Sequence, residues 1–145
     1  MSLYADTGFI CSLHAPDAHT PRVLARMKRL REPLEFTALH RLEFRNAMRL
    51  RVFRGEITAE QRELSIQAML SDLASDVFRF AEPPWSQAFL EAERLSAAHA
   101  ETIGTRSFDI LHVACALVLG AKTFFSFDHR QCALAAAAGL AVASL

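Results

Sequence analysis

The stretch Thr123-Phe124-Phe125-Ser126-Phe127-Asp128 decides how the rest of this 145-residue sequence is interpreted. Its closely spaced phenylalanines predict a buried β-strand. The alanine-rich run that begins at His129 predicts a helix directly after that strand. Asp128 therefore falls where a strand ends and a helix begins. In open α/β sheets ligand sites form outside the carboxyl ends of the strands, so Asp128 is a candidate functional residue.

A second acid, near the start of the chain, has the same setting. Asp6 follows the apolar run Leu3-Tyr4-Ala5 and precedes Thr7-Gly8-Phe9-Ile10. This pattern predicts a strand, a turn and the start of a helix. Both acids thus lie at the carboxyl ends of predicted strands, which is a positional argument for function.

Short apolar runs alternate with longer helical ones along the whole chain. We expect strands near 2–5, 34–37, 77–80, 122–126 and 140–143, and helices at about 7–14, 21–31, 39–54, 58–75, 84–100, 108–119 and 128–138. Alternating strands and helices imply a parallel sheet covered on both faces. The prediction is an α/β fold: one domain over residues 1–145, with a central parallel sheet of four to five strands and helices on both faces.

Local signals mark several helix boundaries. Thr58-Ala59-Glu60-Gln61 is a capping box, in which Thr58 caps the helix and Gln61 reaches back to it. Gly120 and Gly139 follow helical runs and are expected at helix C-termini before the last two strands.

Two further acids are singled out by helical spacing. On the helix at 39–54 one stripe reads Leu39, Glu43, Asn46, Leu50 and Phe53, so a carboxylate and an amide interrupt an apolar face. Such a buried Glu needs a cation, a hydrogen-bond donor or an open cavity beside it. Asp109 begins an almost wholly apolar helix, where it is either a functional acid or a favourable helix-terminal residue.

Composition and charge bound the class of protein. With 52% hydrophobic and 22% charged residues the chain is expected to be a compact globular domain. It has no apolar run of membrane-spanning length and no signal-peptide pattern, so we expect a cytoplasmic protein without membrane contact. Its three cysteines, Cys11, Cys115 and Cys132, form no CxxC motif and are expected to be free thiols.

The net charge of zero hides an asymmetry between two segments. Residues 22–54 carry ten basic and three acidic side chains, whereas residues 55–101 carry three basic and nine acidic ones. The basic segment could face a polyanion while the acidic one repels it. The other interpretation is that both are solvated faces of surface helices.

Several kinds of chemistry are excluded by missing motifs. The five glycines do not occur in GxxxxGK[ST] or GxGxxG spacing, and the elbow GxSxG is also missing. The six histidines include no HExxH pair. His112, one turn after Asp109, is either a ligand or a histidine satisfied in the core.

Hard oxygen donors remain, and they suit Mg²⁺ or Mn²⁺, which favour octahedral geometry and retain several waters. Such ions commonly orient a phosphate and activate a water for in-line attack. An acidic site beside an arginine-rich helix therefore points to a phosphodiester substrate. The arginines of that helix, Arg45 and Arg49 among them, would bind the phosphate backbone of that substrate rather than read its sequence.

At this point the ordered motifs resemble the PIN-domain ribonucleases, and among them the VapC-like toxins of VapBC-type toxin–antitoxin modules. The motifs are Asp6-Thr7-Gly8, Glu43-Phe44-Arg45-Asn46-Ala47, Phe108-Asp109-Ile110-Leu111-His112-Val113-Ala114 and Phe127-Asp128. The resemblance covers essentially the whole chain in length, motif order and spacing.

The resemblance implies a Mg²⁺- or Mn²⁺-dependent endoribonuclease, the toxin of a type II system, that dimerises and is held inactive by a cognate VapB-like antitoxin. Asp6, Glu43, Asp109 and Asp128 match the family's acidic metal-binding residues, and two supporting polar positions match Thr7 and Asn46. One departure is His112, which stands where some relatives have an acid. The number of metal ions, the RNA target and the identity of the antitoxin do not follow from the resemblance.

Three rival interpretations differ in testable ways. A haloacid-dehalogenase-like phosphatase needs a second acid two residues after Asp6, where this chain has Gly8. A receiver-like phosphoacceptor needs an acidic pair near the first strand and an Asp after the third, where Glu82 stands instead. The remaining rival is a degenerate PIN fold that acts only as a binding partner.

Overall fold

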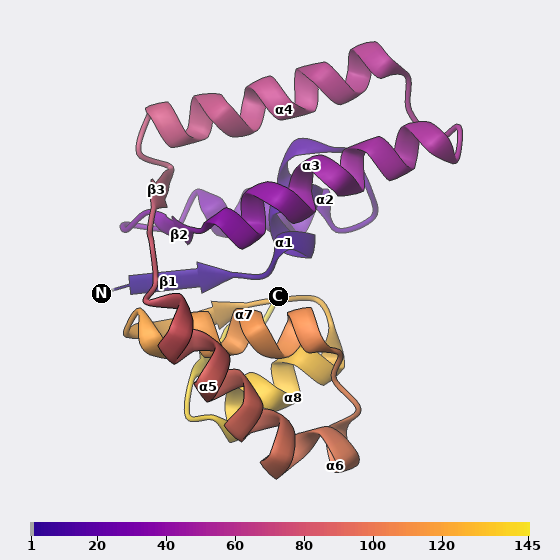
Figure 1. Cartoon of the computed structure of the whole chain (residues 1–145). Coiled ribbons are helices and arrows are strands. Elements are labelled where there is room, and N and C mark those ends of the chain that lie inside the picture. Colours follow the sequence, from indigo (N-terminus) through magenta and orange to yellow (C-terminus); the bar gives the residue numbers. More distant parts are fainter. Residues whose placement is uncertain (1) are drawn as a thin grey trace.

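Five parallel strands form the centre of the structure, a computed structural model that describes residues 2–145 (Figure 1). The strands are β1 (Ser2–Ala5), β2 (Leu34–Phe36), β3 (Phe78–Phe80), β4 (Ala121–Phe125) and β5 (Ala141–Val142). Their order across the sheet is β3-β2-β1-β4-β5, and every pairing is parallel. The predicted parallel α/β sheet is confirmed, and each strand lies within one residue of its predicted ends.

The chain reverses its direction of travel across the sheet between β1 and β4. It moves from β1 through β2 to β3 on one side, and then returns to place β4 and β5 on the other side of β1. Asp6 follows β1, and its backbone N–H donates to the carbonyl of Phe125, the last residue of β4, at 3.0 Å. The residues after these two strands therefore lie at the topological switch point, where open α/β sheets bind ligands.

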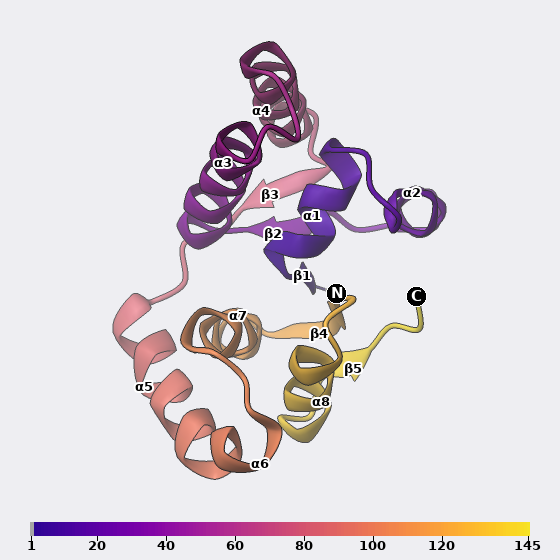
Figure 2. The same cartoon turned by 90° about the vertical axis from the view of Figure 1, so that its right-hand side faces the viewer.

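Helices cover both faces of the sheet, as predicted (Figures 1 and 2). One side holds α1 (Thr7–His14), α2 (Thr20–Met27), α3 (Ala38–Phe53) and α4 (Ala59–Ala74). The other side holds α5 (Trp85–Leu95), the π-helix η1 (Ser96–Ala100), α6 (Glu101–Ile103), α7 (Ser107–Val118) and α8 (His129–Ala137). The sheet is thus the middle layer of three.

Phe124 and Phe125 show how one strand supplies two cores. Successive side chains of a strand point to opposite faces of its sheet. Phe124 packs with Tyr4 in the core beneath α5, α7 and α8, whereas Phe125 packs with Phe9 in the core beneath α1, α3 and α4. Both phenylalanines are at most 2% exposed, so the aromatic strand that the sequence marked is buried on both faces.

The predicted helix boundaries are confirmed by their hydrogen bonds. The backbone N–H of Gln61 donates to the hydroxyl of Thr58 at 3.1 Å, and the N–H of Thr58 donates to the Gln61 side chain at 2.8 Å. Gly120 and Gly139 follow α7 and α8 with φ values of 76° and 94°, a left-handed conformation that favours glycine.

Two predicted helices are shorter than expected. The helix expected at 21–31 ends at Met27, because the following residues form tighter turns in which Arg29 and Leu30 bond to carbonyls three residues back. The helix expected at 84–100 leaves α-helical geometry after Leu95 and continues as η1 and the short α6. Nothing in the structure explains this change to a π-helix.

The apolar stripe predicted on α3 is wrong beyond its first residue, Leu39, which is buried. The rest of the buried face carries His40, Phe44 and Met48, while Asn46 is exposed and Phe53 is 87% exposed. The physical reason is His40, which occupies a core position because its polar atoms are satisfied internally. Its Nδ1 accepts from the N–H of Thr37 at 2.9 Å, and its Nε2 lies 2.7 Å from the carbonyl of Ala5.

The cysteines and the helix lengths test two further expectations. The three cysteines are free, as predicted; Cys115 is buried, whereas Cys11 and Cys132 are partly exposed. Among residues 2–145, no helix combines the length and the apolar character that a bilayer crossing requires.

Candidate functional site

The four predicted acids line two adjoining cavities at the carboxyl edge of the sheet. Asp6, Asp109 and Asp128 line a cavity of about 390 Å³. Asp109 and Asp128 also line a cavity of about 530 Å³, to which α3 contributes Glu43. Because Asp109 and Asp128 are shared, the two cavities form one acidic region at the switch point.

Asp6 combines a structural contact with a place in the site. Its Oδ1 accepts a hydrogen bond from the backbone N–H of Phe9 at 2.8 Å, so Asp6 is the N-cap of α1. Its Oδ2 accepts a hydrogen bond from the hydroxyl of Ser126. Burial raises the pKa of Asp6 and the charge of Asp109 adds to the rise, although both hydrogen bonds oppose it.

Asp128 is also a helix cap, and Ser126 connects it to Asp6. The Oδ1 of Asp128 accepts from the backbone N–H groups of Arg130 and Gln131 at 2.9 and 3.1 Å. The backbone N–H of Asp128 donates to the same Ser126 hydroxyl at 2.9 Å. One buried serine therefore fixes the positions of both strand-end acids.

Asp109 has no such structural contact. It lies in the first turn of α7, whose N-cap is Arg106, and within residues 2–145 its carboxylate receives no hydrogen bond. From the sequence, Asp109 was either a functional acid or a helix-terminal residue. The acids that cap helices are instead Asp6, on α1, and Asp128, on α8. Burial raises the pKa of Asp109, and the charges of Asp128 and Glu43 raise it further.

Glu43 is held by residues from two other helices. Thr7, on α1, donates from its hydroxyl to Oε1 of Glu43 at 2.7 Å. His112, on α7, makes a very short contact from its Nε2 to the same oxygen. Burial would raise the pKa of Glu43, but the hydrogen bonds and the charge of His112 outweigh that effect and lower it.

His112 is a core histidine that contacts an acid of the site. Its exposed fraction is 1%, and it lines neither acidic cavity. The hydroxyl of Tyr4 lies 2.8 Å from Nδ1 of His112, so both ring nitrogens have polar partners. The structure thus favours the core interpretation, with the addition that His112 touches Glu43.

Asn46, Arg45 and Arg49 lie outside the acidic region. Asn46 is exposed and makes no hydrogen bond within residues 2–145. Arg45 and Arg49 follow Glu43 by two and six residues, which places them roughly 200° and 240° around a helix with 3.6 residues per turn. They therefore lie on other faces of α3 than Glu43 and line neither acidic cavity, so their contact with RNA stays a prediction. The arginine that lines the acidic cavity is Arg106.

Sequence reasoning also missed Asp17 and Ser126. Asp17 lines the first cavity from the loop between α1 and α2, held by the Ser12 hydroxyl at 2.7 Å and the His19 N–H at 2.8 Å. It follows no strand and interrupts no apolar stripe, so no signal marked it. Ser126 was visible as the polar residue between Phe125 and Phe127 at the end of the aromatic strand.

A model of the PIN domain family matches residues 3–137. The chain belongs to the PIN domain family. PIN domains are generally nucleases, which supports a hydrolase that acts on nucleic acid. A comparison with curated proteins finds no match.

Two solved structures share the PIN domain's fold. VapBC2 from Rickettsia felis, bound to a DNA fragment from its promoter, aligns with a TM-score of 0.66 and 13% identity, covering 99% of this chain and 98% of that one. FitAcB from Neisseria gonorrhoeae aligns with a TM-score of 0.63 and 20% identity, covering 98% and 96%. At these identities the likeness establishes the fold.

The donor set of this PIN domain fits a hydrated cation with hard-oxygen preference. Within residues 2–145, no three acidic, histidine or cysteine side chains stand close enough to form a ready-made metal cage. Mg²⁺ needs no such cage, since it usually takes one or two carboxylates and keeps several waters. Burial raises the pKa of both Asp6 and Asp109 and neighbouring acids add to the rise, and a bound cation would favour the ionised forms.

Because the pKa of Asp109 is raised, we expect its ionised carboxylate to lower the free energy of unfolding when no metal is bound. Its ionised form is disfavoured in the folded protein, so the cost is present at pH 7 and disappears as pH falls below the ordinary Asp pKa of about 4. In chelator, Asp109→Asn should unfold at a higher urea concentration than the wild type at pH 7. The two proteins should converge near pH 3.5. A variant that is less stable at pH 7 would contradict this electrostatic account.

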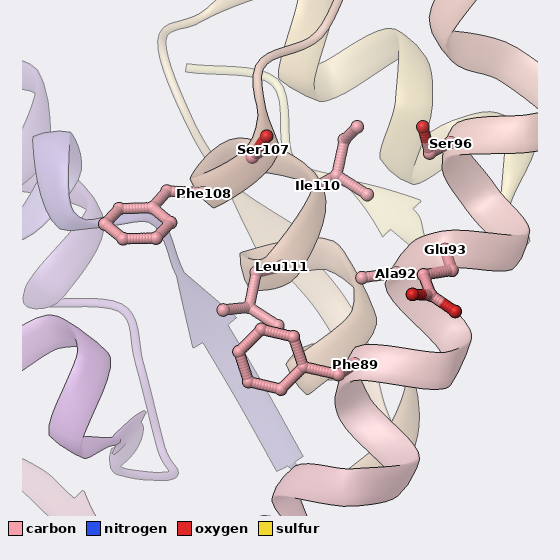
Figure 3. A pocket seen from close by; sticks show the side chains of 8 residues that line it. All are labelled: Phe89, Ala92, Glu93, Ser96, Ser107, Phe108, Ile110 and Leu111. Carbon is pink, nitrogen blue, oxygen red and sulfur yellow. The ribbon is translucent and has the colours of Figure 1, made fainter.

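A separate apolar cavity of about 220 Å³ adjoins the acidic region (Figure 3). Figure 3 shows Phe89 of α5 and Leu111 of α7 close together, with Phe108 on the side away from α5. Ser107 and Phe108 line both this cavity and the acidic one. Its only carboxylate is Glu93, so it has no cluster of groups that could activate water. The candidate chemistry belongs to the acidic region.

Proposed function

We propose that this PIN domain is a Mg²⁺- or Mn²⁺-dependent endoribonuclease that serves as the toxin of a type II toxin–antitoxin system. The observation that carries the nuclease proposal is the meeting of Asp6, Asp109 and Asp128 with Glu43 at the switch point. Like-charged groups are brought together there from four separate segments. Such an arrangement is unfavourable for a purely structural surface and favourable for a cation site.

The residues of the site have distinct roles in this proposal. Asp6, Asp109, Asp128 and Glu43 would hold the cation, which would neutralise the RNA phosphate and lower the pKa of a bound water. Asp6 and Asp128 are kept in place by Ser126 and by their helix caps. Asp109 is the acid with no competing hydrogen bond in residues 2–145, so its carboxylate is available to the cation.

Arg106 is the side chain best placed to bind the phosphate backbone. It lines the cavity that contains Glu43, Asp109 and Asp128, and its permanent charge offsets their repulsion of a polyanion. Arg45 and Arg49, which lie on other faces of α3 than Glu43, would contact only more distant parts of an RNA chain.

Phe108 supports a single-stranded substrate. It is 50% exposed and stands between the acidic and apolar cavities. An exposed aromatic ring beside a phosphate site offers a stacking surface for an unpaired base. RNA loops and ends present such bases, which fits an endonuclease that acts on folded RNA.

Metal removal tests the proposal directly. The purified chain should cut RNA in Mg²⁺ or Mn²⁺, should stop in excess EDTA, and should resume cutting when Mn²⁺ is restored beyond the chelator. Gel analysis of a labelled RNA measures each step, with the Asp109→Asn protein prepared in parallel as a control for contaminating nuclease. Cleavage that continues unchanged in EDTA would exclude a divalent cation from the reaction.

The toxin role is proposed from the likeness to VapBC2 and FitAcB together with the motif order of the chain. Expression of this chain alone should arrest bacterial growth, and a cognate VapB-like antitoxin encoded beside it should restore growth on co-expression. Asp109→Asn should be harmless although it folds. Growth arrest by Asp109→Asn as strong as by the wild type would favour the rival role, a degenerate PIN fold that acts by binding.

We also propose that the chain forms a homodimer. Leu42 on α3 and Phe89 and Leu90 on α5 are between 55% and 66% exposed, and covering such side chains removes apolar surface from water. A second copy could cover them. A monomer mass in light scattering at micromolar concentration would contradict the dimer.

A further inference from the structure

We propose that His112, held by Tyr4, is a positioning residue that orients Glu43 toward the cation site. This inference rests on the proposed function only in treating Glu43 as one of the acids that hold the cation. It assigns a role to a buried histidine that lines neither acidic cavity.

A chain of polar contacts links four elements of the fold. The Tyr4 hydroxyl, on β1, lies 2.8 Å from Nδ1 of His112, on α7. Nε2 of His112 contacts Oε1 of Glu43, on α3, and the hydroxyl of Thr7, on α1, donates to the same oxygen at 2.7 Å. Glu43 is therefore the end point of a network that ties α3 to three other elements, β1, α1 and α7.

The chemistry of the carboxylate sets the direction of the hydrogen bond to Glu43. A carboxylate can only accept, so Nε2 of His112 must carry a proton and donate it to Glu43. Nδ1 and the Tyr4 hydroxyl share the second hydrogen bond, since a hydroxyl can donate or accept. The proton on Nε2 serves Glu43 in either case, as in metal sites where a second residue orients a ligand.

Packing prevents the imidazole from leaving this orientation. Tyr4 is fully buried and stacks on Phe124 with ring centroids 5.8 Å apart. The His112 ring packs edge-on against Tyr4 at 5.7 Å and lies 4.8 Å from the His40 ring. A buried ring confined on two sides presents its N–H in a fixed direction.

The consequence for Glu43 is that its two oxygens have different tasks. Oε1 receives the hydrogen bonds of His112 and Thr7, whereas within residues 2–145 no group donates to Oε2. The side chain is only half-buried and borders the cavity shared with Asp109 and Asp128. A carboxylate fixed through one oxygen keeps the other available to a cation, and loses less freedom when the cation binds.

Two substitutions of His112 separate orientation from packing. His112→Gln places an amide N–H at about the reach of Nε2, whereas His112→Leu removes the donor and keeps an apolar side chain. Mn²⁺ affinity should fall about 10- to 100-fold in His112→Leu. It should stay within about threefold of the wild type in His112→Gln. The fraction of free Mn²⁺, measured by electron paramagnetic resonance, gives both affinities without any RNA.

Thermal unfolding of the metal-free proteins supplies the control, because both variants disturb the Tyr4 contact and should lose a similar amount of stability. Nitrogen-15 NMR of the wild type should show a proton on Nε2 of His112. Wild-type Mn²⁺ affinity in His112→Leu, equal weakening in His112→Gln, or an Nε2 without a proton would each overturn the inference. Mn²⁺ binding without RNA cleavage would instead overturn the proposed function and leave this inference standing.

Discussion

Replacing Asp109 by Asn is expected to reduce RNA cleavage by more than about 100-fold, because a lost cation interaction removes several kcal/mol of transition-state stabilisation. Asp109 lines both acidic cavities and receives no side-chain hydrogen bond within residues 2–145. Asn has the same shape but lacks the charge. Single-turnover cleavage of a labelled RNA at saturating Mg²⁺ measures the effect, separately from any change in folding.

Asp76→Asn is the matched control for this prediction. Asp76 is exposed, lies in neither acidic cavity, and has a φ of 62°, a conformation that Asn also tolerates. Its cleavage rate should stay within about twofold of the wild type, since a distant surface charge is screened by salt. A folded Asp109→Asn protein that cuts RNA as fast as Asp76→Asn would remove Asp109 from the site.

Phe124→Ala is expected to destabilise the fold by about 3–5 kcal/mol, the cost of emptying a phenylalanine site in a core. Phe124 is fully buried, lies on the strand beside the central β1, and stacks on Tyr4. The melting temperature should fall by about 10 °C for a domain of this size. Thermal unfolding followed by circular dichroism, at equal protein and salt concentrations, measures the change.

Phe53→Ala applies the same chemical change to a phenylalanine that is 87% exposed. Most of its surface is already in water, so the loss of stability should be under about 1 kcal/mol. Equal destabilisation by the two substitutions would show that the aromatic strand at 123–127 is not the core element described above.

The sequence predicted the central strands well because their carboxyl ends are buried, as the burial of β1, β2 and β4 shows. The end of β4 is apolar at consecutive positions, Phe124 and Phe125, and Gly120 and Asp128 flank that strand. The site acids at strand ends, Asp6 and Asp128, followed from the same signal. Their additional role as helix caps could not be predicted, because a helix cap and a cation-binding acid both require an acid at the start of the helix.

The orientation of α3 could not be predicted from apolar spacing. His40 is buried because a carbonyl on β1 and the Thr37 N–H satisfy its two nitrogens, and such partners are invisible along the chain. The buried face therefore runs through Phe44 and Met48, which the predicted stripe did not include.

Contacts between distant segments account for the other omissions. His112 and Glu43 are separated by 69 residues, and Ser126 and Asp6 by 120. Only the three-dimensional structure shows that Ser126 joins two acids or that His112 reaches a third. Asp17 lies in a loop whose position depends on the packing of α1 and α2.

The most direct test of the central claim is to locate Mn²⁺ by its anomalous scattering in crystals of the purified chain soaked in the ion. The account predicts an ion in the acidic region, within reach of Asp109 and of Asp6 or Asp128, with waters completing its coordination. It also predicts that Asp109→Asn crystals soaked in the same way lose the peak. Mn²⁺ bound elsewhere while this region stays empty at millimolar concentration would contradict the account.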